Sequence, residues 1–217
     1  MKSMTKVFMV LVLVAVICLP GMASANPLVD LAEVGVDNSA ALSIHADGLG
    51  DLGAYAGNYI LSVINPSGSG NPPIQYSGYC VEPALSSSTS RVYELLPIAN
   101  GSAFKAAAWI LSLGYTTQAP QAQAAVWELT WDTAIGKPFD LSADNFRLYS
   151  SSPSVAEVQA IYDAALAAVP TFNTSGYAIA MNATYQDFVV PVPLPPSALL
   201  LGSGLLGLVG LRRFRKS

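Results

Sequence analysis

The chain has 217 residues, of which 52% are hydrophobic and 11% are charged, and its formal net charge is -4 at pH 7. The two ends are apolar and hold the excess basic charge, so the hydrophobic fraction does not indicate a polytopic membrane protein, and the region between the ends is acidic. Binding to a nucleic-acid backbone requires clustered Lys and Arg, so this composition argues against a nucleic-acid partner.

The N-terminus has the pattern of a secretory signal peptide. Basic residues precede an apolar run from Val7 to Leu19, and Ala23 and Ala25 supply the small residues of a cleavage site. We therefore predict that residues 1–25 are removed and that the rest of the chain is exported.

The next part of the chain reads as β-structure. Strand-like runs at Tyr59–Ile64 and Ser77–Val81 are separated by a segment rich in Pro, Gly and Ser, which is typical of a turn or loop. Helical patterns follow and predict three helices, at residues 102–113, 120–131 and 154–169. Strand-like patterns then predict two further strands, at residues 177–181 and 188–190.

Capping signals set the helix boundaries. Ser102 precedes the first helix and Gly114 follows it, and Pro120 stands in the first turn of the second helix, where proline is tolerated. Ser154 and Glu157 have the spacing of a capping box at the start of the third helix.

Residues 26–190 are enough for one domain with a hydrophobic core. The order of strands, helices and strands predicts an α+β fold. In this fold a β-sandwich or barrel-like sheet carries an inserted small helical subdomain, flanked by the signal peptide and a C-terminal apolar helix.

The chain ends with a proline-rich segment, a short apolar run and a basic tip. The run from Ala198 to Leu211 is shorter than the roughly 20 residues of a comfortable membrane span, so it indicates a transient anchor. Positive charge at the end of a span favours the cytoplasmic side. This basic tip consists of Arg212, Arg213, Arg215 and Lys216.

These C-terminal features, over residues 191–217, resemble a PEP-CTERM sorting signal. The family motif is Val-Pro-Glu-Pro, and this chain has Val192, Pro193, Leu194 and Pro195, with Leu in place of Glu. The resemblance implies a Gram-negative bacterium in which an exosortase-type membrane protease removes the tail. The protein would be held at the inner membrane transiently and then pass to the cell surface or extracellular matrix.

The exported region contains one cysteine, Cys80. A single cysteine in an oxidising compartment cannot close an internal disulfide. The residues alone leave four interpretations open: a buried inert thiol, an intermolecular disulfide, a catalytic nucleophile, or a thiol used in another internal bond.

The sequence around Cys80 and a later helix resembles the thioester domains of bacterial surface adhesins. The matching features are Tyr79-Cys80 on a strand and a Gln-x-Ala-Val-Trp element that begins at Gln123. The resemblance covers roughly residues 59–132. It implies an internal thioester between the Cys80 sulfur and the side-chain carbonyl of Gln123.

Helix geometry favours Gln123 over its neighbours. Residues three and four apart share a helix face, so Gln123 is stacked with Val126 and Trp127, whereas Gln121 is on a small or solvated face. Gln118 precedes Pro120, a position biased away from helix.

A thioester must be shielded from water, and we expect the shield to consist of Tyr79, Trp109, Val126 and Trp127. The alternative that Gln123 is a buried amide with backbone partners stays open.

The chemistry implied by the resemblance is single-use covalent capture. The Cys80 thiolate displaces ammonia from Gln123, and an amine or hydroxyl on a partner protein or polysaccharide then attacks the thioester carbonyl. Such a domain is an adhesin without enzymatic turnover and needs no cofactor. A structural matrix protein, in which the thioester or thiol only stabilises the fold, is the second hypothesis, and a cysteine hydrolase is a remote third.

Other polar residues give weaker signals. His45 is the one histidine, and a catalytic pair with Cys80 would need a long-range contact. Asp47 and Asp51 match part of a calcium loop, but the full spacing and its terminal Glu are missing. We therefore predict no metal site.

Overall fold

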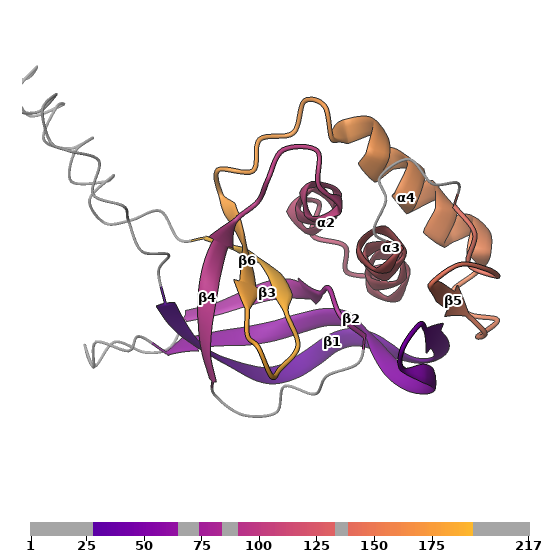
Figure 1. The fold of residues 1–217 in the computed structure, drawn as a ribbon, viewed down its shortest axis with the longest axis horizontal. Coiled ribbons are helices and arrows are strands. Elements are labelled where there is room, and N and C mark those ends of the chain that lie inside the picture. Colours follow the sequence, from indigo (N-terminus) through magenta and orange to yellow (C-terminus); the bar gives the residue numbers. More distant parts are fainter. Residues whose placement is uncertain (1–27, 65–73, 84–90, 133–138, 193–217) are drawn as a thin grey trace, which may run out of the picture.

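The computed structural model describes residues 28–64, 74–83, 91–132 and 139–192. In these residues the fold is mixed α+β, with a closed six-stranded antiparallel barrel and three helices (Figure 1). The strands are β1 (Leu28–Ala46), β2 (Gly50–Ile64), β3 (Ile74–Cys80), β4 (Arg91–Pro97), β5 (Phe146–Leu148), β6 (Tyr177–Met181) and β7 (Phe188–Pro191). The helices are α2 (Ala103–Ser112), α3 (Ala119–Trp131) and α4 (Val155–Ala168).

The barrel closes in the order β1-β2-β3-β7-β6-β4 and returns to β1, and every neighbouring pair is antiparallel. Strand β5 lies outside this ring and pairs with the far end of β1. Closure gives each barrel strand a neighbour on both sides, which removes the open edges that would otherwise invite pairing with another chain.

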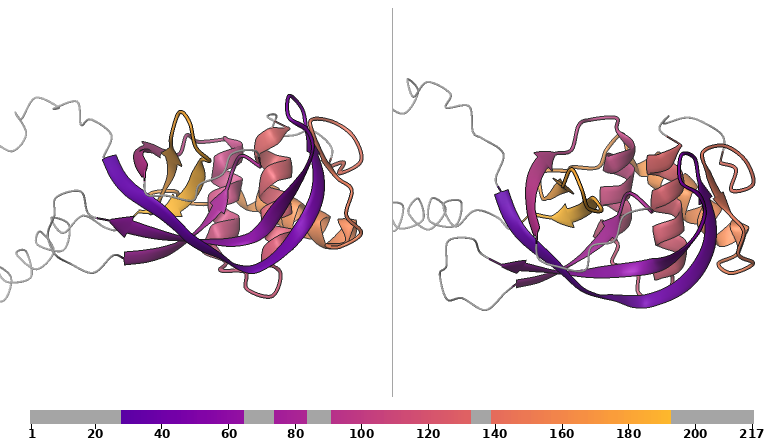
Figure 2. Two further views of the ribbon diagram at one scale, coloured as in Figure 1. Left: turned by 90° about the horizontal axis from the view of Figure 1, so that it is seen from below. Right: turned by 60° about the horizontal axis from the view of Figure 1, so that its bottom comes forward.

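Strands β1 and β2 form a long hairpin that curves around one side of the molecule (Figure 2). The register of β1 shifts between Glu33 and Gly35 and again between Asp37 and Ala40. Such bulges bend a strand and increase its twist. The bend lets β1 pair with β4 near its start and with β5 near its end.

All three helices lie between β4 and β6 in the sequence, although these two strands pair directly in the barrel. Helix α3 lies between α2 and α4 and packs on β2 (Figure 1). Pro120 is in its first turn, and the expected capping box of Ser154 and Glu157 is present at the start of α4. The helices and the barrel share one continuous hydrophobic core.

The predicted helices and the four predicted strands are confirmed, with boundaries that differ by a few residues. The sheet is a closed barrel. Strands β1, β4 and β5 were not predicted, and β2 begins earlier than expected, at Gly50. The predicted signal peptide and the predicted sorting segment from Pro193 onward lie outside the described residues. Within the described ranges, no helix has the length and apolar character to cross a membrane.

Candidate functional site

Cys80 is the last residue of β3 and lies where the barrel meets the helices. It pairs in register with Phe188 of β7, and its side chain is fully buried. Gln123, in the middle of α3, is also fully buried. The two residues are 43 positions apart in the sequence.

Two hydrogen bonds join Gln123 to the backbone of Cys80. The Cys80 N–H donates to Oε1 of Gln123 over 3.0 Å, and Nε2 of Gln123 donates to the Cys80 carbonyl oxygen over 2.7 Å. The structure therefore brings the two predicted residues together. Gln123 does have backbone partners, as the alternative interpretation required, and they belong to Cys80 itself.

A further bond orients helix α3 on the end of β3. The Thr130 hydroxyl donates to the Val81 carbonyl oxygen over 2.9 Å. Thr130 is two turns after Gln123, on the same helix face. This face of α3 therefore meets the end of β3 at two points, which fixes the position of the Gln123 carboxamide.

The sulfur of Cys80 has its own set of polar neighbours. Its thiol donates to the carbonyl oxygen of Glu82 over 2.8 Å. The Nε2 of Gln186 donates to the sulfur, and it also donates to the Glu82 carbonyl oxygen over 3.1 Å. Sequence reasoning missed Gln186, which is 106 positions away from Cys80 and belongs to no motif.

Burial raises the pKa of the Cys80 thiol far above its ordinary value. The Trp127 indole, the backbone at Glu82 and the Gln186 side chain oppose this shift. The indole N–H nevertheless has no partner with hydrogen-bond geometry among the described residues, so it acts on the sulfur as a nearby dipole. The thiol is therefore protonated at neutral pH, and a buried thiol of this kind is inert toward external reagents.

The proposed shielding residues differ in position. Val126 and Trp127 are fully buried, and Trp127 packs on Phe146 with ring centroids 5.9 Å apart. Tyr79 is also fully buried, on β3 next to Cys80. Trp109 of α2 is partly exposed and packs at the margin of the core. Of these four residues, Trp127 is the one that lowers the pKa of the Cys80 thiol.

The face of α3 that carries Gln121 has mostly small side chains, but it is not exposed to solvent. Ala124, Ala125 and Glu128 on this face are buried, because helix α4 packs on α3. The Gln121 side chain lies close enough to Glu157 of α4 to lower the pKa of that carboxyl. The Gln121 side chain therefore faces α4, whereas the Gln123 side chain contacts the end of β3.

His45 is engaged away from Cys80. Its Nδ1 is 2.7 Å from Oδ1 of Asp51, and its Nε2 is 3.3 Å from Oδ1 of Asp47. The ring nitrogens of His45 therefore contact these two carboxylates, and the geometry does not support a Cys-His pair. Among the residues with a described position, no group of three or more His, Cys, Asp and Glu side chains could hold a metal ion.

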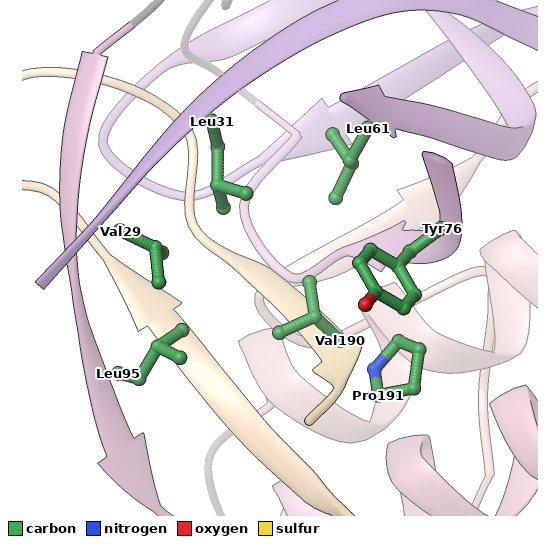
Figure 3. Close-up of a pocket in the computed structure, with 7 residues that line it drawn as sticks. All are labelled: Val29, Leu31, Leu61, Tyr76, Leu95, Val190 and Pro191. Carbon is green, nitrogen blue, oxygen red and sulfur yellow. The ribbon is translucent and has the colours of Figure 1, made fainter. Parts of the chain in front are cut away.

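A separate hollow opens at the other end of the barrel (Figure 3). Its lining is apolar except for the hydroxyl of Tyr76, and it offers no nucleophile or charged group. The lining residues are Val29, Leu31, Leu61, Tyr76, Leu95, Val190 and Pro191. The hollow therefore supplies no group for covalent chemistry.

No known family model, curated protein or solved structure matches this chain. The functional argument rests on the residues around Cys80.

Proposed function

We propose that this chain is an exported attachment protein in which Cys80 and Gln123 form an internal thioester. The observation that carries the proposal is the pair of hydrogen bonds that hold the Gln123 carboxamide against the backbone of Cys80. A hydrogen-bond donor on a carbonyl oxygen stabilises the negative charge that develops there during nucleophilic attack. The N–H of Cys80 is such a donor on Oε1 of Gln123.

The bond-forming step is balanced without a co-reactant. The Cys80 sulfur attacks the carboxamide carbon of Gln123, the carbon–nitrogen bond breaks, and the thiol proton leaves with the nitrogen as ammonia. The product is an acyl thioester in a site from which water is excluded. An amine or hydroxyl of a partner protein or polysaccharide then attacks the same carbonyl, which leaves an amide or ester bond and returns the thiol. Each domain reacts once.

A purely structural crosslink is the second candidate, because Cys80 and Gln123 are both 0% exposed. An external amine reaches the carbonyl only if the site opens. An unopened crosslink would still close a loop across the 43 positions between the two residues. By the loop-entropy relation for disulfides, such closure stabilises the fold by about 4 kcal/mol.

The two ends of the chain supply the proposed route to the surface. Residues 1–25 direct export, and residues 191–217 act as a PEP-CTERM-type signal. This signal holds the chain briefly at the inner membrane until an exosortase-type protease removes the tail. The attachment domain then belongs to the cell surface or extracellular matrix, where amines and hydroxyls are available.

Intact mass spectrometry of the purified exported protein tests the thioester. We expect a mass one ammonia below that of the sequence, and no thiol labelling when the protein is denatured in the presence of an alkylating reagent. Denaturation is needed because Cys80 is buried in the folded protein with or without the crosslink. The Gln123→Ala variant is the control, with the full mass and one alkylated thiol. A wild-type protein that matches this control in both respects would exclude the thioester.

A further inference from the structure

Two carboxamides approach Cys80 from different elements. Gln123 of α3 binds the backbone of Cys80, and Gln186, two residues before β7, contacts the sulfur. The proposed thioester uses one of them as the acyl group. The second therefore needs an explanation of its own.

Gln186 is held in place by the barrel. It is 4% exposed and lies between the turn at Asn182 and strand β7. The Val81 N–H donates to the carbonyl oxygen of Asp187 over 3.0 Å, and the side chain of Asp187 accepts from the Asn182 N–H over 2.7 Å. These bonds fix the backbone on one side of Gln186, so its side chain is preorganised toward the sulfur.

The orientation of the Gln186 carboxamide follows from its second partner. The same nitrogen that contacts the sulfur is 3.1 Å from the Glu82 carbonyl oxygen, which can only accept a hydrogen bond. The –NH₂ group of Gln186 must therefore face Cys80. In Gln123 the carbonyl oxygen is the atom that receives the Cys80 N–H, as an acyl group under attack requires.

The ionisable groups that act electrostatically on the sulfur are Glu82, Tyr59 and Tyr93, and all three are acids. Around Tyr93 stand the Asp187 and Glu33 carboxyls and the Arg91 guanidinium, which act on Tyr93. An anionic sulfur at this site is therefore stabilised by neutral dipoles, of which the Gln186 amide is in direct contact with it.

Given the thioester proposed above, we infer that Gln186 is a positioning residue for its formation and opening. Its N–H group donates to the Cys80 sulfur while the sulfur carries negative charge, either before it attacks Gln123 or as an amine displaces it. The acyl carbon, the departing ammonia and the transferred proton all belong to Cys80 and Gln123. Gln186 changes no covalent bond.

The test follows ammonia loss during refolding of the full-length chain. Unfolded chain from inclusion bodies still carries an amide at Gln123, so dilution into buffer starts the reaction and intact mass records its progress. We expect Gln186→Leu to slow ammonia loss at least tenfold, because a hydrogen bond to a charged group contributes about 1.5–3 kcal/mol and 1.4 kcal/mol is tenfold in rate. Gln159→Leu, at an exposed position of α4, is the matched control and should react at the wild-type rate.

The Gln186→Glu variant separates this role from a structural one. Its carboxyl group donates a hydrogen bond when protonated and repels an anionic sulfur when ionised. We expect ammonia loss in this variant at acidic pH and a loss of reaction as the pH rises, relative to wild type at each pH. This pH profile carries the test even if Gln186→Leu fails to fold.

Three outcomes would overturn the inference. Equal rates in wild type and both Gln186 variants at every pH would remove Gln186 from the reaction while leaving the thioester intact. Peptide mapping that places the acyl group on Gln186 would assign it the other role. A wild-type chain that never loses ammonia would overturn the thioester and the inference together.

Discussion

Oε1 of Glu128 accepts a hydrogen bond of 3.0 Å from the backbone N–H of Asp140. Its other oxygen, Oε2, is buried with no partner in the described part of the chain. Glu128 lies on α3, five residues after Gln123, and its side chain is 2% exposed. A half-satisfied carboxyl group in the core makes the stability of the helix layer sensitive to pH.

We predict that the free energy of unfolding falls as the pH rises from about 4.5 to about 7. Burial raises the pKa of Glu128 from 4.5 to about 7, with the Asp140 N–H opposing the shift and nearby Asp carboxylates adding to it. The folded state therefore binds this proton more tightly than the unfolded chain. The stabilisation is complete below the unfolded pKa and is lost as the pH passes the folded pKa.

Glu128→Gln should remove the part of this slope that Glu128 contributes, because the amide keeps the Oε1 acceptor and cannot ionise. The expected difference between the two pH curves is about 3 kcal/mol, measured by denaturant unfolding at intervals from pH 4 to pH 8. Asp187, whose pKa burial raises to about 6, contributes a slope of the same sign that remains in the variant. Parallel curves for wild type and variant would contradict the prediction.

We predict that Gly57→Ala destabilises the barrel by about 1–3 kcal/mol. A Cβ at Gly57 would lie 2.8 Å from the Asp37 carbonyl oxygen and 2.9 Å from the Ser39 Cα, both backbone atoms of the β1 bulge. Gly53→Ala is the matched control in the same strand, because a Cβ there meets nothing within 4 Å. Denaturant midpoints of the two variants check the prediction, and equal midpoints would show that the bulge yields without cost.

We predict that methylamine adds covalently to Gln123 and exposes one thiol at Cys80. Cys80→Ala and Gln123→Ala should each abolish addition, and Gln121→Ala should leave it intact, because Gln121 contacts α4 rather than β3. Peptide mapping after incubation locates the adduct. A thioester that forms but never accepts methylamine, even over long incubation, would favour the structural crosslink over covalent attachment.

We predict that the mature surface form lacks the basic tip Arg212–Lys216. Val192 should be kept in any truncation, because its N–H donates to the Gly176 carbonyl oxygen over 2.8 Å. Deletion from Pro193 onward should therefore preserve the fold and release the protein into the medium unanchored. Immunoblots of cell and medium fractions, with mass spectrometry of the C-terminus, provide the measurement. An intact C-terminus in extracellular material would contradict the expected processing.

The helices could be predicted because their signals are local. A capping box needs two residues three apart, and Ser154 and Glu157 suffice to start α4. Strand β1 escaped prediction because its bulges break the two-residue alternation that marks a strand. The break falls at Asp37, Asn38 and Ser39, and Asn38 has a positive φ of 49°. The first part of β2 contains several Gly and Ala residues, which carry little strand propensity.

The candidate site also has a part that local sequence patterns predict and a part that depends on the fold. The Tyr79-Cys80 and Gln123–Trp127 elements are short patterns that a resemblance can match, and the structure brings them together. Gln186 lies outside any pattern, and its contact with the sulfur exists only because β7 pairs with β3. Contacts of this kind follow from barrel closure, which one sequence read alone does not specify.

The position of β7 in the ring also has a consequence for the timing of folding. Phe188–Pro191 is the last strand in the chain, and it is the link between β3 and β6 that completes the barrel. A chain that crosses a membrane from its N-terminus onward can assemble α2, α3 and α4 early, since their contacts are close in sequence, but it cannot close the ring until residue 191 has emerged. In the proposed export route, the sulfur of Cys80 would therefore remain without Gln186 until translocation of the folded region is almost complete.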